Sequence, residues 1–196
     1  MLLHPFRYDK QRVGKIFHSK SWSCTSSSFF IGLTRPFNGN YALSLEYGRG
    51  GNRKLMMITE NIRGQRYYQL IDILAKRCSR FAFVENRQLM ENEELRLAAV
   101  DELIAPIENL LIERKVQNEW ETTTLGEHTA FVFYFLLNDT TAQFLKEHSD
   151  SLFGWITPEL PEDLMFYEDE QCLLAACSHE GFFWVDEKVW DRLLLS

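Results

Sequence analysis

The stretch CLLAACSHEGFFWV (residues 172–185) places two cysteines, a histidine and a glutamate among large apolar side chains. Its two apolar runs are separated by HEG (179–181), and glycine readily adopts the positive φ that a tight turn requires. The stretch therefore predicts an antiparallel hairpin. Because positions 172 and 177 differ by an odd number, regular strand geometry points Cys172 and Cys177 to opposite faces.

The same spacing argues against a metal site or a nucleophile. Zinc sites usually contain a closely spaced cysteine pair that is repeated or followed by histidines. Here Cys177 and His179 can share a face, but two ligands do not make a site, and no recognisable catalytic signature surrounds the thiol. We expect packing and turn residues, with no catalytic residue, metal or cofactor. An enzyme that depends on Cys177 and His179 is the third and least favoured function.

Patterns on both sides of the hairpin predict an α+β fold. Apolar alternation and turn residues predict strands at 27–34, 41–47, 55–62, 80–86, 120–125, 128–138, 164–167, 172–178 and 182–185. Helical spacing and capping residues predict helices at 65–78, at 92–104 after Asn92, at 140–153 after Asp139 and at 187–195 after Asp186. Residues 106–116 are either another helix or the far side of a bend, because Pro106 interrupts the preceding helix.

These elements predict one compact domain over residues 1–196, with an N-terminal and a C-terminal antiparallel sheet region and about four or five helices. The strand at 128–138 is apolar on both faces and is expected at the centre of its sheet. Residues 155–164 contain two prolines and are expected to form a surface loop.

Composition excludes several classes of protein. With 45% hydrophobic and 14% aromatic residues the chain is too apolar to be disordered. The apolar run at 130–137 is far shorter than the roughly 20 residues of a membrane-spanning helix, and MLLHPFRYDKQR (1–12) lacks a signal-peptide core. The four scattered cysteines are typical of reduced thiols, so we expect a cytoplasmic location.

Charge is divided unevenly along the chain. Residues 1–80 contain 14 Lys and Arg against 4 Asp and Glu, a net charge of +10, whereas residues 81–196 carry a net charge of −17. Such a division has three explanations: a basic surface for a polyanion, an acidic surface for a basic partner, or two parts that attract each other.

The leading hypothesis is a non-enzymatic protein-binding or inhibitory protein, of an immunity-like or regulatory kind, that presents acidic loops to a basic partner. In size and charge the chain resembles small acidic α+β proteins with which bacteria neutralise toxins, although no motif supports this resemblance. The residues expected to bind the partner are Glu159, Glu162, Asp163, Glu168, Asp169 and Glu170.

The alternative is a nucleic-acid-binding module in the basic part. Arginines and lysines around GRGGNRK (48–54) offer phosphate contacts, and a tyrosine offers a ring for base stacking. The residues expected in that interface are Arg49, Arg53, Lys54, Arg63, Arg66 and Tyr67.

Overall fold

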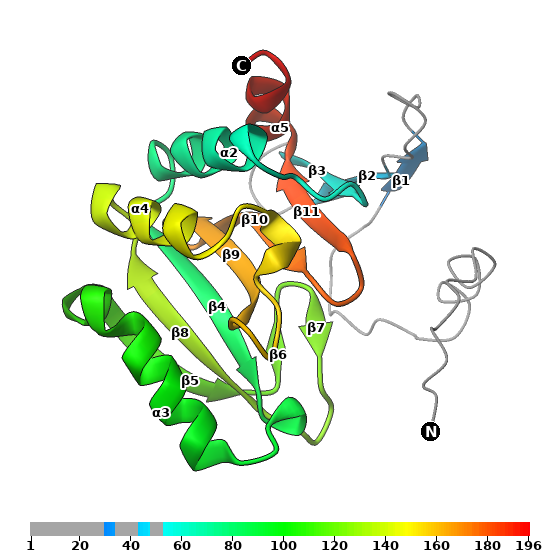
Figure 1. The fold of residues 1–196 in the computed structure, drawn as a ribbon. Coiled ribbons are helices and arrows are strands. Elements are labelled where there is room, and N and C mark those ends of the chain that lie inside the picture. The colour runs from blue at the N-terminus through cyan, green and yellow to red at the C-terminus, as the bar shows by residue number, and fades with distance from the viewer. Residues whose placement is uncertain (1–29, 34–42, 48–52) are drawn as a thin grey trace, which may run out of the picture.

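A computed structural model describes residues 30–33, 43–47 and 53–196, and it has an α+β fold dominated by one antiparallel sheet (Figure 1). The nine strands of this sheet run in the order β1-β2-β3-β11-β10-β9-β4-β8-β5. They are β1 (Phe30–Leu33), β2 (Leu43–Tyr47), β3 (Arg53–Ile58), β4 (Arg80–Asn86), β5 (Leu111–Gln117), β8 (Ala130–Leu136), β9 (Glu162–Glu168), β10 (Gln171–Cys177) and β11 (Phe182–Asp186). A separate short hairpin pairs β6 (Glu119–Trp120) with β7 (Thr123–Thr124).

Four α-helices occur in the described ranges, in agreement with the predicted number. They are α2 (Gln65–Ala75), α3 (Glu93–Ile104), α4 (Asp139–His148) and α5 (Glu187–Leu194), and the 3-10 turns are η1 (Arg87–Leu89), η2 (Ala105–Leu110) and η3 (Leu152–Gly154). None of the helices in this part of the chain is long and apolar enough to cross a membrane.

The two predicted sheet regions form one continuous sheet. Strand β11 pairs with β3, with Phe183 opposite Ile58 and Val185 opposite Met56. The N-terminal meander β1-β2-β3 thereby extends the C-terminal meander β9-β10-β11. The hairpin at 172–185 is confirmed, with Gly181 at φ 69° in its turn.

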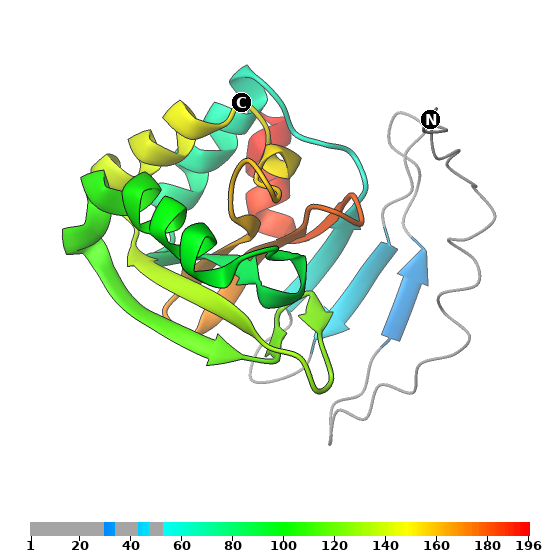
Figure 2. The same cartoon turned by 60° about the horizontal axis from the view of Figure 1, so that its bottom comes forward.

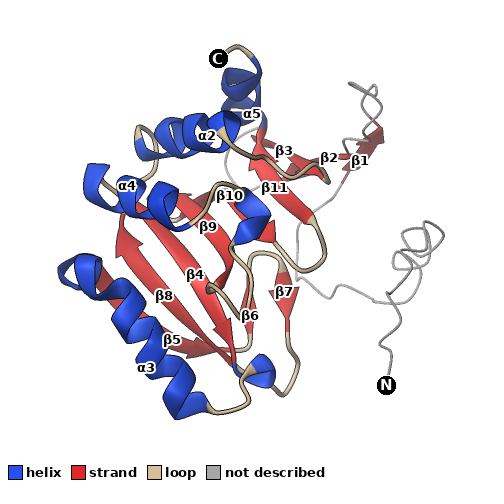
Figure 3. Cartoon of the chain, in the orientation of Figure 1, coloured by secondary structure: helices blue, strands red, loops and turns tan. Residues whose placement is uncertain are grey.

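The helices cover one face of the sheet (Figures 2 and 3). On that face, strands β4 and β8 contribute stacked phenylalanines, with the Phe81 and Phe135 ring centroids 5.2 Å apart. Trp155 from the segment after η3 lies 6.1 Å from the Phe83 ring and is fully buried. Burial of these large rings against the helices forms the main hydrophobic core.

The opposite face has a smaller apolar cluster. Trp120 from the β6–β7 hairpin packs there with Val84, Val132 and Met165 of the sheet. The short hairpin therefore covers part of the face that the helices leave open.

Side-chain caps place the helix ends close to the predicted positions. Asn92 accepts a hydrogen bond from the backbone N–H of Leu95, and Asp186 accepts one from that of Lys188, so both predicted caps are confirmed. Helix α4 is capped one residue earlier than predicted. The side chain of Asn138 and that of Thr141 form a reciprocal capping box there, which Asp139 cannot complete.

For residues 106–116 the sequence left open a second helix or the far side of a bend. The structure has the 3-10 turn η2 up to Leu110, followed by the sheet-edge strand β5 from Leu111. Two expectations about this part of the chain were wrong. Strand β8 is interior but lies next to this edge strand, so it is not central. The predicted surface loop ends at residue 161, since Glu162 already belongs to buried β9.

The cysteines at 172 and 177 also differ from expectation. A register shift between Cys172 and Leu174 in the β9–β10 pairing interrupts the strict alternation of side chains. Cys172 packs with Ala175 in the cluster opposite the helices, and Cys177 lies two residues beyond Ala175 on the same strand face. The two thiols therefore share a face, at opposite ends of β10.

A buried ion pair connects helix α3 to the sheet. Arg96 donates from Nε and Nη2 to the two carboxylate oxygens of Glu85, at 2.8 and 2.5 Å. The side chain of Glu85 is 1% exposed and that of Arg96 is 18% exposed. Burial still raises the pKa of Glu85, since desolvation outweighs the two hydrogen bonds and the charge of Arg96.

Substitution Arg96→Ala is expected to lower the free energy of unfolding by about 3–5 kcal/mol, because it leaves the buried Glu85 carboxylate without its cation. Arg96→Lys is expected to cause a smaller loss, since an ammonium group cannot make both parallel bonds. Urea unfolding at constant pH measures both. The control is Arg66→Ala, which breaks an exposed 3.6 Å pair with Glu60 and is expected to cost less than about 1 kcal/mol. Equal losses for the two alanine variants would contradict the assigned role of Arg96.

Candidate functional site

A surface groove of about 390 Å³ lies between α3, the end of α4 and the segment before β9. Its apolar lining comes from Ala99, Val100, Leu103, Pro106 and Pro161. Two exposed carboxylates also line it, Glu102 on the helix and Glu159 on the loop. The groove thus combines apolar side chains with two negative groups from separate elements.

The positive groups in the groove are already engaged by neighbours. Arg96 is held by Glu85 and also donates from Nη1 to the carbonyl oxygen of Pro158, at 2.5 Å. His148 has its Nδ1 2.8 Å from the carbonyl oxygen of Phe144, a geometry in which that nitrogen donates. The guanidinium of Arg96 is therefore engaged within the fold, and the negative charge of Glu159 also acts on it.

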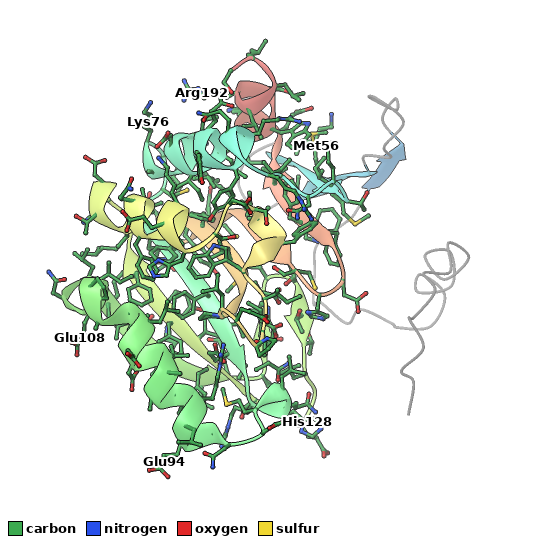
Figure 4. All side chains as sticks on the ribbon, in the orientation of Figure 1. Met56, Lys76, Glu94, Glu108, His128 and Arg192 are labelled. Carbon is green, nitrogen blue, oxygen red and sulfur yellow. The ribbon has the colours of Figure 1, made fainter. Side chains whose placement is uncertain are left out.

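Helix α3 and the following turn η2 carry further exposed acidic and apolar side chains. Val100 and Ile104 face the core, whereas Leu95 is 70% exposed. Glu94 and Glu108 project from either end of this region into solvent, as Figure 4 shows. The exposed side of α3 therefore presents apolar and acidic groups together.

A second cluster, of titratable side chains, lies at the start of β9, directly after the loop that borders the groove. Asp163 is fully buried and has φ 58°, a conformation that Asp tolerates better than most residues. Its Oδ1 accepts from the backbone N–H of Ser178 at 2.8 Å and its Oδ2 from Trp120 Nε1 at 3.0 Å. The register of β9 against β4 shifts between Met165 and Glu162, and at this bulge the carboxylate of Asp163 bonds to the end of β10 and to the β6–β7 hairpin.

Glu162 is buried beside Asp163, and few neighbouring groups offset the cost of burying its carboxyl group. Its side chain is 1% exposed, and within the described residues neither carboxylate oxygen has a hydrogen-bond donor. Its neighbour at the surface is His179, whose Nδ1 lies 3.8 Å from Oε2. Burial, together with the charges of Asp163 and Glu85, raises the pKa of Glu162 to about 7.

Cys177 and His179 complete this cluster. The Sγ atom of Cys177 lies 4.0 Å from Nε2 of His179. Burial, followed by the negative charge of Asp163, raises the pKa of the Cys177 thiol to about 12. A nucleophilic cysteine needs the opposite shift, so the surroundings of Cys177 favour a protonated thiol at neutral pH.

The six acidic residues predicted to bind a partner do not form one surface. Glu159 lines the groove, and Asp169 is exposed in the β9–β10 turn. Glu162 and Asp163 are buried. The other two are in ion pairs with the basic part of the chain, Glu168 with Arg77 at 3.4 Å and Glu170 with Arg80 at 2.9 Å.

These pairs belong to a wider contact between the basic and acidic parts. Arg77 also pairs with Asp186 at 3.3 Å, and Lys54 pairs with Glu187 at 2.6 Å. Attraction between the two parts, one of the three explanations of the charge division, is therefore present in this structure.

The residues of the alternative nucleic-acid interface have different surroundings. Arg49 and the side chain of Arg53 lie outside the described residues, Lys54 is paired with Glu187, and Arg66 lies 3.6 Å from Glu60. Arg63 is exposed. Tyr67 is fully buried in α2, so it offers no ring face to a base.

Sequence reasoning missed the groove and the connection of Asp163 to Cys177 and His179. The two residues Asp163 and Ser178 are 15 positions apart, and pairing of β9 with β10 brings them together. The consecutive acidic pair at 162–163, directly before an apolar run, was the available signal.

Substitution Tyr67→Phe tests the structural role of this tyrosine. Its hydroxyl donates to the carbonyl oxygen of Leu145 at 3.1 Å and accepts from Trp155 Nε1 at 3.0 Å. Loss of the hydroxyl leaves two buried groups without a partner, and we expect the free energy of unfolding to fall by about 1–3 kcal/mol. Chemical denaturation followed by tryptophan fluorescence measures the change. The control Tyr68→Phe alters the adjacent, half-buried ring and is expected to change stability by less than about 0.5 kcal/mol; an equal loss there would contradict the assignment.

Comparison with known proteins supplies no relative: the chain matches no protein-family model, no curated protein and no solved structure.

Proposed function

We propose that this chain is a non-enzymatic protein-binding protein that receives a basic partner at the α3 groove. The observation that carries the proposal is the combination of apolar lining residues with Glu102 and Glu159 from separate elements. A lysine or arginine side chain has a matching structure, because its methylene stem is apolar and its head is cationic.

The charge around the groove supports the same partner. Glu94, Glu108 and Glu102 follow the exposed side of α3 and its continuation, and their negative potential favours the approach of a basic surface. Leu95 supplies exposed apolar area beside them. Basic segments with apolar residues between the charges fit this surface best.

The proposed interface differs from the one expected from the sequence. Of the six acidic residues expected there, Glu159 remains, and helix α3 supplies the other acidic residue of the groove, Glu102. The raised pKa of Cys177 is a reason to favour binding over catalysis by a thiolate.

The experiment uses the full chain and a short peptide that alternates lysine and leucine residues. We expect amide NMR signals of α3 and of residues 158–161 to shift on titration, with affinity falling steeply as salt increases. The double variant Glu102→Gln/Glu159→Gln is expected to bind about tenfold more weakly, since each lost charge contact is worth about 0.5–1 kcal/mol.

The matched control is Glu119→Gln/Glu127→Gln, which removes the same charge from two exposed glutamates near the β6–β7 hairpin. This variant is expected to keep the affinity of the unmodified chain within about twofold. Equal weakening in both double variants, or signal shifts distributed away from α3, would overturn the proposal.

A further inference from the structure

Three side chains with metal-binding atoms meet where β9 and β10 lie side by side. A carboxylate oxygen of Asp163, Sγ of Cys177 and a ring nitrogen of His179 all lie within 4.8 Å of one another. Asp163 and Cys177 are buried, while the side chain of His179 is 42% exposed. One exposed ligand therefore faces two buried ligands.

The two inner ligands are positioned by the sheet. Antiparallel pairing of β9 with β10 and the positive φ of Asp163 direct its carboxylate toward the end of β10. The hydrogen bonds from Ser178 and Trp120 use one lone pair on each oxygen of Asp163 and leave the others available. Donors of this kind orient carboxylate ligands in metal sites.

Glu162 provides an independent observation that points to a bound cation. It is fully buried, and neither of its oxygens has a hydrogen-bond donor among the described residues. Its Oε2 lies 3.8 Å from Nδ1 of His179, while Nε2 of the same ring faces Cys177 at 4.0 Å. A histidine that binds a metal through Nε2 and donates its Nδ1–H to a carboxylate has the same order of neighbours, and the 3.8 Å between Nδ1 and Oε2 must shorten before that hydrogen bond forms.

The distances require a small closing movement. Zn–S and Zn–N bonds of about 2.3 and 2.0–2.1 Å at a tetrahedral angle place sulfur and nitrogen about 3.6 Å apart. The observed 4.0 Å between Sγ and Nε2 is close to that value. Rotation of the exposed His179 side chain can shorten this distance.

The chemistry of the three ligands selects the class of ion. Thiolate, imidazole and carboxylate together suit Zn²⁺ and Co²⁺, whereas Mg²⁺ and Ca²⁺ prefer oxygen ligands. We propose that Asp163, Cys177 and His179 bind one zinc-class divalent ion, with Glu162 accepting the Nδ1–H bond that orients His179.

Three protein ligands leave a fourth position on the exposed side of the ion, where His179 borders solvent. Binding converts the Cys177 thiol to a metal-bound thiolate and releases its proton to solvent. The positive charge of the ion also compensates the two buried carboxylates at 162 and 163, which otherwise oppose each other.

The test is titration of the metal-free, reduced full chain with Co²⁺, with thiolate-to-cobalt charge-transfer absorption as the readout, followed by competition with Zn²⁺. We expect one ion per chain and a charge-transfer band that Zn²⁺ removes. His179→Gln changes an exposed side chain and is expected to weaken binding by at least about 100-fold, with the fold intact by circular dichroism. Glu162→Gln is expected to weaken it by about 10–100-fold, as loss of an orienting carboxylate does.

Matched controls separate this site from adventitious binding. Cys172→Ser removes the thiol at the other end of β10, and His128→Gln removes an exposed imidazole elsewhere, so both are expected to retain the band and the affinity. Cys177→Ser is expected to abolish the band. Absence of the band in the unmodified chain, or its persistence in Cys177→Ser or at unchanged affinity in His179→Gln, would overturn the proposal.

Discussion

Pairing between β3 and β11 is the contact on which the architecture depends. Those strands are the outermost strands of two meanders, and their register places Ile58 beside Phe183 on the helix-covered face. The same pairing brings the basic part of the chain beside the acidic part, where Lys54 meets Glu187. Continuity of the sheet and compensation of opposite charges therefore arise from the same register.

The sequence was most informative where a residue acts on its immediate neighbours. Asn92 and Asp186 cap helices through bonds to backbone groups two or three positions away, so their roles could be predicted from local spacing. Gly181 could be predicted for the same reason. Residues 111–117 were harder, because an exposed edge strand with mixed charges lacks the regular alternation that identifies a half-buried strand.

The candidate sites could not be predicted in the same way, because both depend on contacts between distant segments. The groove needs α3 beside residues 159–161, and the cluster at Asp163 needs the register of β9 against β10. A bulge also placed Cys172 and Cys177 on one face, which simple counting of positions had excluded. Only the consecutive acidic residues 162 and 163 were a sign of unusual burial.

The edge strand β5 has a consequence for how copies of this chain meet. Its central residue is Arg114, whose guanidinium lies 4.6 Å from the centre of the Phe133 ring and is therefore held at the strand. Arg114 also lies 3.6 Å from Asp101 of α3, so its charge is compensated within the molecule. Strand β5 carries Glu113, Arg114 and Lys115 in succession, and charged side chains on an edge strand oppose its pairing with another chain.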